Sequence, residues 1–502
     1  MRVANNYYKT YAELVQNLKS QYNKSMEKVS SGRKYATGAD NPSAYYQGEK
    51  LENLYNDVEA KDQILGDVLH RMEQQEASSK ALHTEMGNIN TTLIKVANAT
   101  EQDDTGIVDT VMTELKQRQN TMTQDLNLQY ENYYVMGGND SDTVPFSSEI
   151  DANNKFTMTY HHKFAGDEEV THIKMTFDPD IDNGDGTSGA FTYDIVDADG
   201  NVKDLATKDG DKTRVNTGKD IIDETGIPAD IQLDDGNVLT IGDVYKDKDG
   251  NITSYLLKYR DAAGNDLELK DDDGNVLTGD ARQAKIAEMR QEAATSERQD
   301  SALDGLLVAM REQGRMALGY GTVVTGQRDT LPDTYFGGMN MITGLTSDQM
   351  RTLDDDAAKT EIQKYMNKSA FGLNAKAIDS IGDYQTELNQ YSEDLTGYDT
   401  TRMNGLREKM TSDLGGILDE WDNSMQRVIS TTRHIGVTYN TLSTMQSQLQ
   451  VQQDTYQTEY DDKLGVDTAD AITKMYSDRF AYIAALQVGS KIMQNSLFDF
   501  VQ

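Results

Sequence analysis

The two ends of this chain carry apolar residues at the same interval. Ile472 and Ile483 are eleven positions apart near one end, and Tyr7, Leu18 and Val29 repeat that interval near the other. An eleven-residue repeat averages about 3.67 residues per turn, so each series follows one face of an α-helix. Two helices with matching apolar faces, separated by more than four hundred residues, are expected to pair with each other.

The last segment is predicted to be one amphipathic helix. Asp467 can cap its start by accepting a hydrogen bond from a free backbone N–H, and Asp470 adds a negative charge that the helix dipole favours. The apolar stripe behind this cap consists of Ile472, Met475, Ile483, Leu486, Met493, Leu497 and Phe500. An ordinary core helix can show such spacing by chance over three repeats, so the expected pairing depends on both ends of the chain together.

Long helical patterns lie inside these two ends. The first helix is expected to stop near Gly32, because glycine suits the left-handed position after a helix. Asn41 can then cap a new helix with Pro42 at its first position, where proline's missing N–H does no harm. Apolar periodicity predicts helices over the ranges 43–98, 107–132, 281–318 and 400–462, with one or two more between 347 and 395.

The middle of the chain has a different character. Short runs of alternating apolar and polar residues follow residue 145, and the tripeptide Asp-Gly-Asn recurs between them at 199–201, 235–237, 249–251 and 273–275. Asp-Gly and Gly-Asn favour hairpin turns because these residues tolerate positive φ. The sequence therefore predicts an inserted antiparallel β domain.

The fold class that follows is α+β. The expected architecture is an elongated antiparallel bundle of long helices, built from the two ends of the chain, with a β-rich domain inserted in the middle. The predicted segments are terminal assembly helices at 1–40 and 465–502, a long-helix bundle at 41–144 and 396–464, the β insert at 145–280, and a mixed helical and loop region at 281–395.

Composition excludes several classes of partner. The formal net charge is −36, so nucleic acid and anionic membranes are not expected to bind. The chain contains no cysteine, and no run of about 18 apolar residues suggests a membrane span. Its first residues lack the basic and apolar regions of an ordinary secretory signal, although other export routes use no such signal.

No catalytic, cofactor or metal site is expected from motifs. His161, His162 and His172 could gather around a metal, but the H-E-x-x-H pattern is absent and exposed strand positions are the favoured interpretation. The Asp-rich turns fail the calcium-loop template of EF-hands. They are interpreted as solvated hairpin turns, with incidental weak calcium binding as the alternative. The chain is not expected to be an enzyme.

Both ends resemble the flagellin-like axial proteins of bacteria, specifically the hook–filament junction (hook-associated protein 3) group. The segment SSGRKYATGADNPSAYY resembles the turn of that family, and residues 134–138 resemble its aromatic–Gly-Gly segment, which residues 335–338 echo loosely. FAYIAALQVGSKIMQNSLFDFVQ is similar to the family's closing pattern. The resemblance covers about 1–140 and 400–502. Asn41 stands where many members have a second aspartate.

The resemblance implies a structural protein of the flagellum, exported through the flagellar type III pathway without a cleaved signal peptide. It implies extracellular head-to-tail assembly into a helical ring, with a neighbouring hook-associated protein, flagellin and an export chaperone as partners. The interface residues expected on this basis are Leu14, Leu18, Val29, Arg33, Asn41, Pro42, Ile483, Leu486, Met493, Leu497 and Phe500. The last four of these, Leu486, Met493, Leu497 and Phe500, are also candidates for the chaperone contact; packing within the molecule is the alternative role.

Three other functions stay open. The chain could be a flagellin, although Asn41-Pro42 stands where flagellins usually carry Asp-Ala-Ala-Gly. It could be an extracellular, adhesin-like binding module whose β insert recognises a ligand. A flagellin-like enzyme would need a catalytic constellation in the insert, and no motif for one is visible.

Overall fold

The computed structural model describes residues 2–97, 104–184, 187–209, 212–271, 273–312, 336–393 and 400–498. The fold is α+β. The chain divides into two compact units, of which the first consists of Met1–Leu69 and Thr441–Gln502 and the second of His70–Asn440. Helices α2 (Pro42–Ala97) and α9 (Thr400–Lys463) contribute residues to both units.

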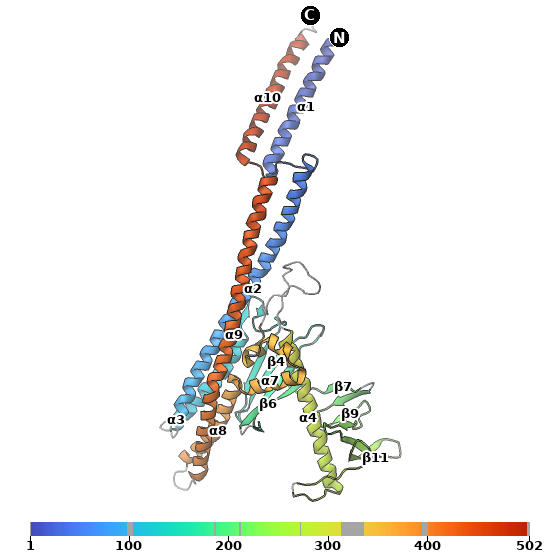
Figure 1. Cartoon of the computed structure of the whole chain (residues 1–502), viewed down its shortest axis with the longest axis vertical. Coiled ribbons are helices and arrows are strands. Elements are labelled where there is room, and N and C mark those ends of the chain that lie inside the picture. Colours follow the sequence, from blue (N-terminus) through green and yellow to red (C-terminus); the bar gives the residue numbers. More distant parts are fainter. Residues whose placement is uncertain are drawn as a thin grey trace. The chain divides into compact units, whose positions relative to one another are not determined.

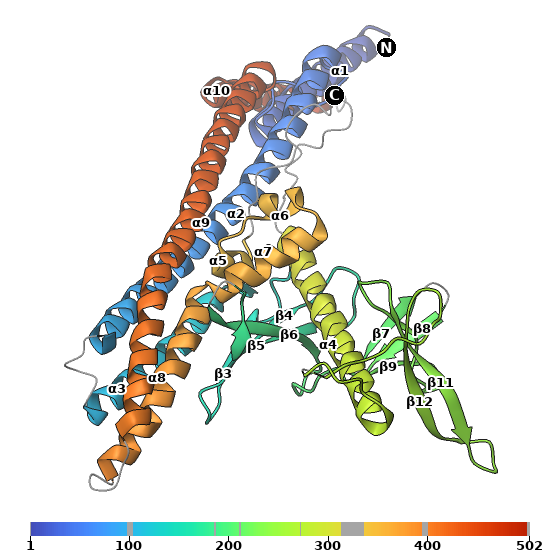
Figure 2. The ribbon, with the colours of Figure 1, turned by 60° about the horizontal axis from the view of Figure 1, so that its bottom comes forward.

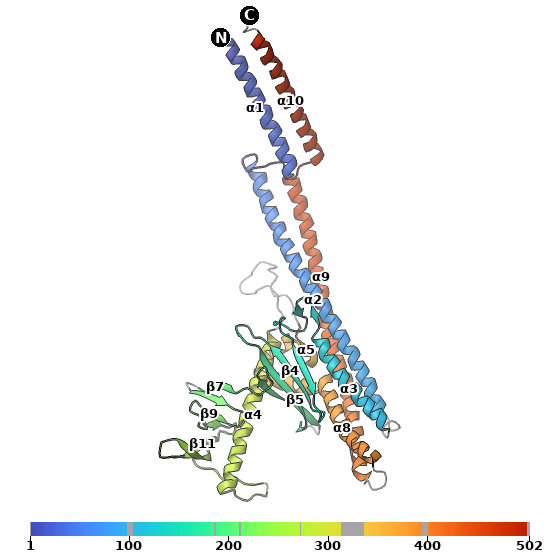
Figure 3. The same ribbon diagram turned by 180° about the vertical axis from the view of Figure 1, so that it is seen from behind.

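The first unit is built from two antiparallel helix pairs. Helix α1 (Arg2–Ser31) packs against α10 (Thr468–Phe498), and the two lie side by side in Figure 1. The initial part of α2 lies beside the final part of α9 (Figure 3). These two helices approach closely where Leu464, fully buried, rests on Gly48: a Cβ at Gly48 would lie 1.9 Å from the Leu464 Cδ1 atom. The expected pairing of the chain's two ends is therefore present.

A four-helix arrangement forms the long-helix part of the second unit. Here α2 and α9 are joined by α3 (Thr105–Leu126) and α8 (Ala370–Glu393). The buried Trp421 of α9 donates from Nε1 to the carbonyl of Met86 on α2 at 3.0 Å. Ser380 of α8 donates to the Asp413 carboxylate of α9 at 2.8 Å. Each helix thus contacts its neighbours through specific polar bonds as well as apolar packing.

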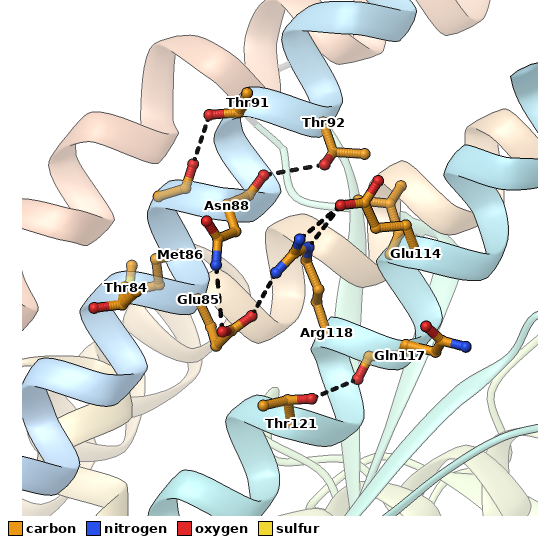
Figure 4. Close-up of polar contacts among 12 residues, drawn as sticks. Thr84, Glu85, Met86, Asn88, Thr91, Thr92, Glu114, Gln117, Arg118 and Thr121 are labelled. Carbon is orange, nitrogen blue, oxygen red and sulfur yellow. Dashed lines mark hydrogen bonds and ion pairs between the residues drawn. The ribbon is translucent and has the colours of Figure 1, made fainter.

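One arginine connects α2 to α3. Arg118 donates to Glu85 of α2 at 2.8 Å and to Glu114 of its own helix at 2.7 Å (Figure 4). The hydrogen bond from Arg118 holds the pKa of the Glu114 carboxyl below its ordinary value, although burial opposes this shift. Figure 4 also shows hydroxyl groups of neighbouring threonines bonded to carbonyls one turn earlier, as for Thr91.

Helix α3 ends earlier than its apolar periodicity predicts. The expected end was residue 132, whereas the helix stops at Leu126. The side chain of Asn127 accepts from the backbone N–H of Phe146 at 3.0 Å and donates to its carbonyl at 2.7 Å. This paired contact directs the chain away from the helix and into a short hairpin, β1 (Gln129–Tyr130) and β2 (Tyr133–Tyr134).

The two aromatic–Gly-Gly segments pair with each other. Gly137 and Gly337 form an isolated antiparallel bridge, and Gly338 donates from its N–H to the Met136 carbonyl at 2.8 Å. The fully buried Gln75 of α2 donates to the carbonyls of both segments. The loose echo noted in the sequence therefore corresponds to a contact between the two segments.

A four-stranded antiparallel sheet lies next to these helices. Its strands follow chain order: β3 (Phe146–Ile150), β4 (Phe156–His162), β5 (Thr171–Asp182) and β6 (Ser188–Val196). Phe156 stacks on Phe371 of α8, and the N–H of Phe191 donates to Asn367 of α7 (Asp355–Asn367) at 2.9 Å. The sheet thus shares its core with helices of the predicted mixed region, to which the short α5 (Gly338–Thr343) and α6 (Ser347–Thr352) also belong.

Two smaller antiparallel sheets pack on α4 (Gly279–Arg311), as Figure 2 shows. One contains β7 (Leu205–Asp209), β8 (Lys212–Asn216) and β9 (Ile221–Asp223). The other contains β10 (Ile231–Gln232), β11 (Val238–Lys246) and β12 (Ile252–Arg260). Their shared core is a cluster of buried residues that includes Ile221, Leu239, Leu257, Ile286 and Ala294.

Buried arginines of α4 fasten these sheets. Arg290 is fully buried and donates to the carbonyls of Leu239, Ile221 and Ala229 and to the carboxylate of Asp220. About two helical turns later, Arg298 donates to two further carbonyls of the β region, those of Asn216 and Lys203. Each guanidinium therefore bonds backbone carbonyls of the strands, such as Leu239 of β11 and Asn216 of β8, as well as carbonyls of the connecting segments.

The Asp-rich turns are closed hydrogen-bonded loops. In the turn that begins at Asp247, the carboxylate accepts from the N–H groups of Asp249 and Asn251, and Gly250 has a positive φ of 86°. Asp197, Asp261 and Asp271 begin turns with the same bonds. Hydrogen bonds from the asparagine four residues on hold the pKa of these carboxyls below the ordinary value. Their carboxylates thus serve the turn itself.

Candidate assembly interface

The pairing of α1 and α10 uses one face of each helix. The α1 residues between 9 and 31 that are shielded from solvent are Tyr11, Val15, Leu18, Tyr22, Ser25 and Val29. Those of α10 between 470 and 491 are Ala471, Met475, Asp478, Tyr482, Ala485 and Gly489. In both helices the intervals alternate between four and three residues, which is the heptad spacing of coiled coils. We refer to these two rows as the seam.

The seam corrects the eleven-residue interpretation. Ile472 and Ile483, which define that series in α10, are 37% and 41% exposed and lie outside the seam. Its shielded positions include small and polar residues such as Ser25, Asp478 and Gly489. Three consecutive steps of four, three and four also span eleven residues, as between Leu18 and Val29, so this interval alone does not separate the seam from the row of Ile472 and Ile483. An alternation of four and three that admits small residues would have found the seam.

A polar contact lies in the middle of the seam. The Ser25 hydroxyl donates directly to the Asp478 carboxylate, which is only 6% exposed, and Lys474 forms an ion pair with the same carboxylate at 3.0 Å. Burial by itself raises the pKa of Asp478, but the bonds from Ser25 and Lys474 outweigh it and hold that pKa below its ordinary value. The aspartate is therefore ionised at neutral pH, and its buried hydrogen bond to Ser25 across the two helices favours one register.

Aromatic contacts flank the polar contact. Tyr22 and Tyr482 stack with their rings nearly parallel, 6.4 Å apart between centroids. Tyr11 donates from its hydroxyl to the carbonyl of Ala485 at 2.7 Å. An open groove of about 830 Å³ runs beside these residues and is lined by Tyr11, Ala12, Val15, Gln16, Lys19, Tyr482 and Leu486.

Large apolar side chains remain exposed on both helices outside the seam. On α10, Ile472, Tyr476, Phe480 and Ile483 follow one another at steps of four, four and three, and Phe480 is 80% exposed. The exposed apolar side chains of the two helices are Tyr7, Leu14, Met26, Ile472, Tyr476, Phe480, Ile483, Leu486 and Val488. Contiguous exposed apolar surface is a mark of an interaction site.

The turns that connect the two helix pairs are bonded to each other. Arg33, after α1, pairs with Glu49 and Glu52 of α2 at 3.0 and 2.6 Å and lies over the ring of Tyr460 in α9. Arg33 also forms an antiparallel bridge with Gly465. The N–H of Lys34 donates to the Leu464 carbonyl at 2.6 Å, and that of Val466 to the Gly32 carbonyl at 3.0 Å. The connection between α1 and α2 and the connection between α9 and α10 are thus held together by backbone hydrogen bonds.

The helix caps near these turns match their sequence signals. The Asn41 side chain accepts from the N–H of Ala44 at 3.2 Å, and Pro42 is the first residue of α2. Asp467 accepts from the N–H groups of Ala469 and Asp470. Asn41 and Pro42 therefore set the start of α2 and lie outside the seam, as does Arg33.

The remaining expected interface residues fall into three groups. Leu18 and Val29 lie in the seam. Leu14, Ile483 and Leu486 are exposed by 52%, 41% and 43% and are available to a partner. Met493 and Leu497 lie on the helical backbone of α10, with side-chain surroundings that the structure does not describe, and Phe500 lies outside the described residues. Sequence reasoning missed Tyr476, Phe480 and Val488, whose helical spacing was the available signal.

Two other features are absent from the described residues. Within the part of the chain that the structure describes, no helix is long and apolar enough to cross a bilayer. Among those same residues, no three or more side chains of His, Asp or Glu gather as metal ligands. No family model matches the chain, and the comparison with curated proteins found no relative.

Proposed function

We propose that this chain is a structural subunit that assembles with neighbouring subunits through the exposed faces of α1 and α10. The observation that carries the proposal is the stripe of Ile472, Tyr476, Phe480 and Ile483, which stays exposed although α10 already packs on α1. Burying a large apolar side chain is worth about 1.5–3 kcal/mol, so a partner that covers the stripe gains substantial free energy.

Contacts through the stripe can repeat from subunit to subunit. The stripe and the seam lie on different faces of α10, so the surface that binds a neighbour is not the surface that binds α1. Contact between two different patches on identical subunits is heterologous, and it propagates as a helix or ring instead of closing as a dimer. Head-to-tail self-assembly follows when a neighbour covers the stripe with a patch other than its own stripe.

We infer further that the assembly is the junction between hook and filament of a bacterial flagellum. Support comes from the resemblance of the turn around Arg33 and Asn41 and of the closing segment of α10 to that family. The bonds between Arg33, Glu49 and Tyr460 give this turn a defined structural role, because they join the seam helices to α2 and α9. On this proposal the chain is exported by the flagellar type III route and acts outside the cell without catalysis.

The proposed partners follow from the same surface. Flagellin and a neighbouring hook-associated protein would contact the assembled ring on either side. An export chaperone would cover the exposed stripe of α10 before assembly, because an uncovered apolar stripe promotes premature polymerisation. The acidic net charge of −36 disfavours non-specific side-by-side association of subunits.

Reconstitution on isolated hooks tests this proposal. Purified chain is added to hooks of the source bacterium that lack their junction proteins, followed by the partner hook-associated protein and flagellin, and growth is followed by electron microscopy. The proposal predicts a short segment of bound chain that is required before flagellin polymerises. A deletion of residues 467–502 is expected to abolish binding. If the full chain leaves hooks bare, the junction proposal is wrong.

The same experiment separates the flagellin alternative. A flagellin extends long filaments from hooks that already carry junction proteins, whereas a junction protein stops after a short segment. Filaments formed by this chain alone would therefore assign it as the filament subunit. The exposed faces of α1 and α10 would serve assembly in both cases.

A further inference from the structure

Two histidines of the four-stranded sheet face each other across neighbouring strands. His161 of β4 and His172 of β5 are register partners, and their Nδ1 atoms lie 2.7 Å apart. Both side chains are partly exposed. They therefore combine close approach of two imidazole nitrogens with access from solvent.

The strand pairing explains this closeness. The N–H of His161 donates to the carbonyl of Pro145 at 2.8 Å, which lies on the side of β3 and away from β5. His161 and His172 are accordingly a non-hydrogen-bonded pair of the β4–β5 ladder. In such pairs the Cα atoms are only about 4.5 Å apart and the side chains approach more closely than in hydrogen-bonded pairs. The sheet backbone thus fixes the distance between the two rings.

A third side chain can set the tautomer of His161. The Ser147 hydroxyl of β3 lies 2.8 Å from His161 Nε2. When this hydroxyl accepts a hydrogen bond from Nε2–H, the lone pair of the ring is left on Nδ1, the atom that faces His172. Metal-binding histidines characteristically have their second nitrogen held in this way by an outer partner.

We propose that His161 and His172 form a two-histidine chelate for a divalent transition metal, with Cu²⁺ or Ni²⁺ preferred over Zn²⁺. Both Nδ1 atoms act as ligands, and Ser147 is the positioning residue. The N–H proton that one Nδ1 now shares with the other moves to Nε2 of His172, so both rings stay neutral. Water supplies the remaining ligands, because no third His, Asp or Glu joins the group among the described residues.

The ligand separation decides the metal preference. Two nitrogens 2.7 Å apart, each about 2.0–2.1 Å from a metal, subtend an angle of about 80–85° at that metal. This is close to the right angle between adjacent ligands in the square-planar and tetragonal sites of Cu²⁺ and Ni²⁺. Both rings turn their Nδ1 lone pairs from each other towards the metal on binding, and tetrahedral Zn²⁺, which prefers about 109°, requires them also to move apart.

Copper titration of the full-length protein tests the proposal. Cu²⁺ is added in excess Mg²⁺, which occupies the surface carboxylates, and binding is followed by calorimetry and electron paramagnetic resonance. The expected result is one site whose spectrum shows two equatorial nitrogens. His161→Gln and His172→Gln are each expected to weaken binding at least about tenfold, since each removes one ligand. His70→Gln, which changes an exposed histidine of α2, should bind like the wild type.

Circular dichroism shows whether each variant keeps its fold. Ser147→Ala provides an independent variant, because it leaves both ligands in place and should weaken binding while the two-nitrogen spectrum is retained. Oxygen-only coordination in the wild type would overturn the proposal. A two-nitrogen spectrum that persists in His172→Gln would overturn it as well.

Discussion

The hydroxyl oxygen of Tyr11 lies only 1.9 Å from the position that a Cβ atom would take on Gly489. The same hydroxyl donates to the carbonyl of Ala485. Glycine at position 489 thus allows the tyrosine of α1 to reach the backbone of α10. The seam depends at this point on the absence of a side chain.

Gly489→Ala is therefore expected to disrupt the seam. The new methyl group overlaps the Tyr11 ring, and overpacking of this kind costs about 1–3 kcal/mol. Hydrogen exchange of α1 and α10 should become faster. Gly436→Ala in α9 is the matched control, because a Cβ there meets no atom within 4 Å. It should stabilise the helix by up to about 1 kcal/mol. In a Tyr11→Ala background, the Gly489 change should have little further effect; an unchanged large effect there would contradict the clash.

The polar contact of the seam predicts a pH dependence. The pKa of Asp478 is lower in the folded protein than its ordinary value of 3.8. Its contribution to stability is therefore complete above about pH 3.8 and is lost as pH falls through the lower, folded value. Hydrogen exchange of α10, measured from neutral to acidic pH, should show this loss in the wild type. Asp478→Asn should weaken the seam at neutral pH and remove this acid step; retention of the step would assign it to another group.

Arg290 is expected to be critical for the two small sheets. Arg290→Met removes every guanidinium donor. The buried carbonyls and the carboxylate of Asp220 then lose the hydrogen bonds that they accept from Arg290. Loss of one partner from a buried ionic network costs about 3–5 kcal/mol. Protection of the backbone N–H groups of β9, β10 and β11 from hydrogen exchange should fall by the factor that corresponds to this loss of free energy. Arg260→Met, at an exposed pair with Asp266, should change this protection far less. Equal effects of the two changes would contradict the role of Arg290.

Asp379 of α8 is expected to lower the stability as pH rises, which is the opposite of the effect of Asp478. Burial, together with neighbouring Asp383, raises its pKa to about 6. Because this raised value favours the protonated form in the folded state, stability is lost as pH rises from about 4 towards 6. Asp379→Asn should stabilise the protein at pH 7 by about 1 kcal/mol, after allowance for solvent screening of a partly exposed group. Thermal unfolding of the wild type and of Asp379→Asn at pH 4 and pH 7 measures this difference in stability. Asp422→Asn, an exposed control on α9, should change little.

Much of the helical framework follows from the sequence. Asn41, Pro42 and Asp467 start their helices as the capping rules predict, because these signals act within one turn of chain. The end of α3 was not predictable in this way. Asn127 stops it by bonding to Phe146, and such a tertiary contact leaves no local signal.

The candidate interface was only partly predictable for a similar reason. Large apolar residues at helical spacing indicated that α1 and α10 pair, but they could not say which stripe of α10 faces α1. Small residues at 471, 485 and 489 and the acid at 478 make that choice, since close approach needs little volume. Phe480 and Ile483 are left outside by this packing.

The exposed stripe of α10 provides the most direct test of self-assembly. Full-length protein, the double variant Phe480→Gln/Ile483→Gln and the control Val451→Gln are compared by sedimentation velocity over rising concentration. Val451 is also exposed, at 65%, but lies on α9. The account predicts concentration-dependent oligomers for the wild type and the control, and a monomer with unchanged helix content for the double variant. A wild type that stays monomeric throughout, or a double variant that assembles equally well, would contradict it.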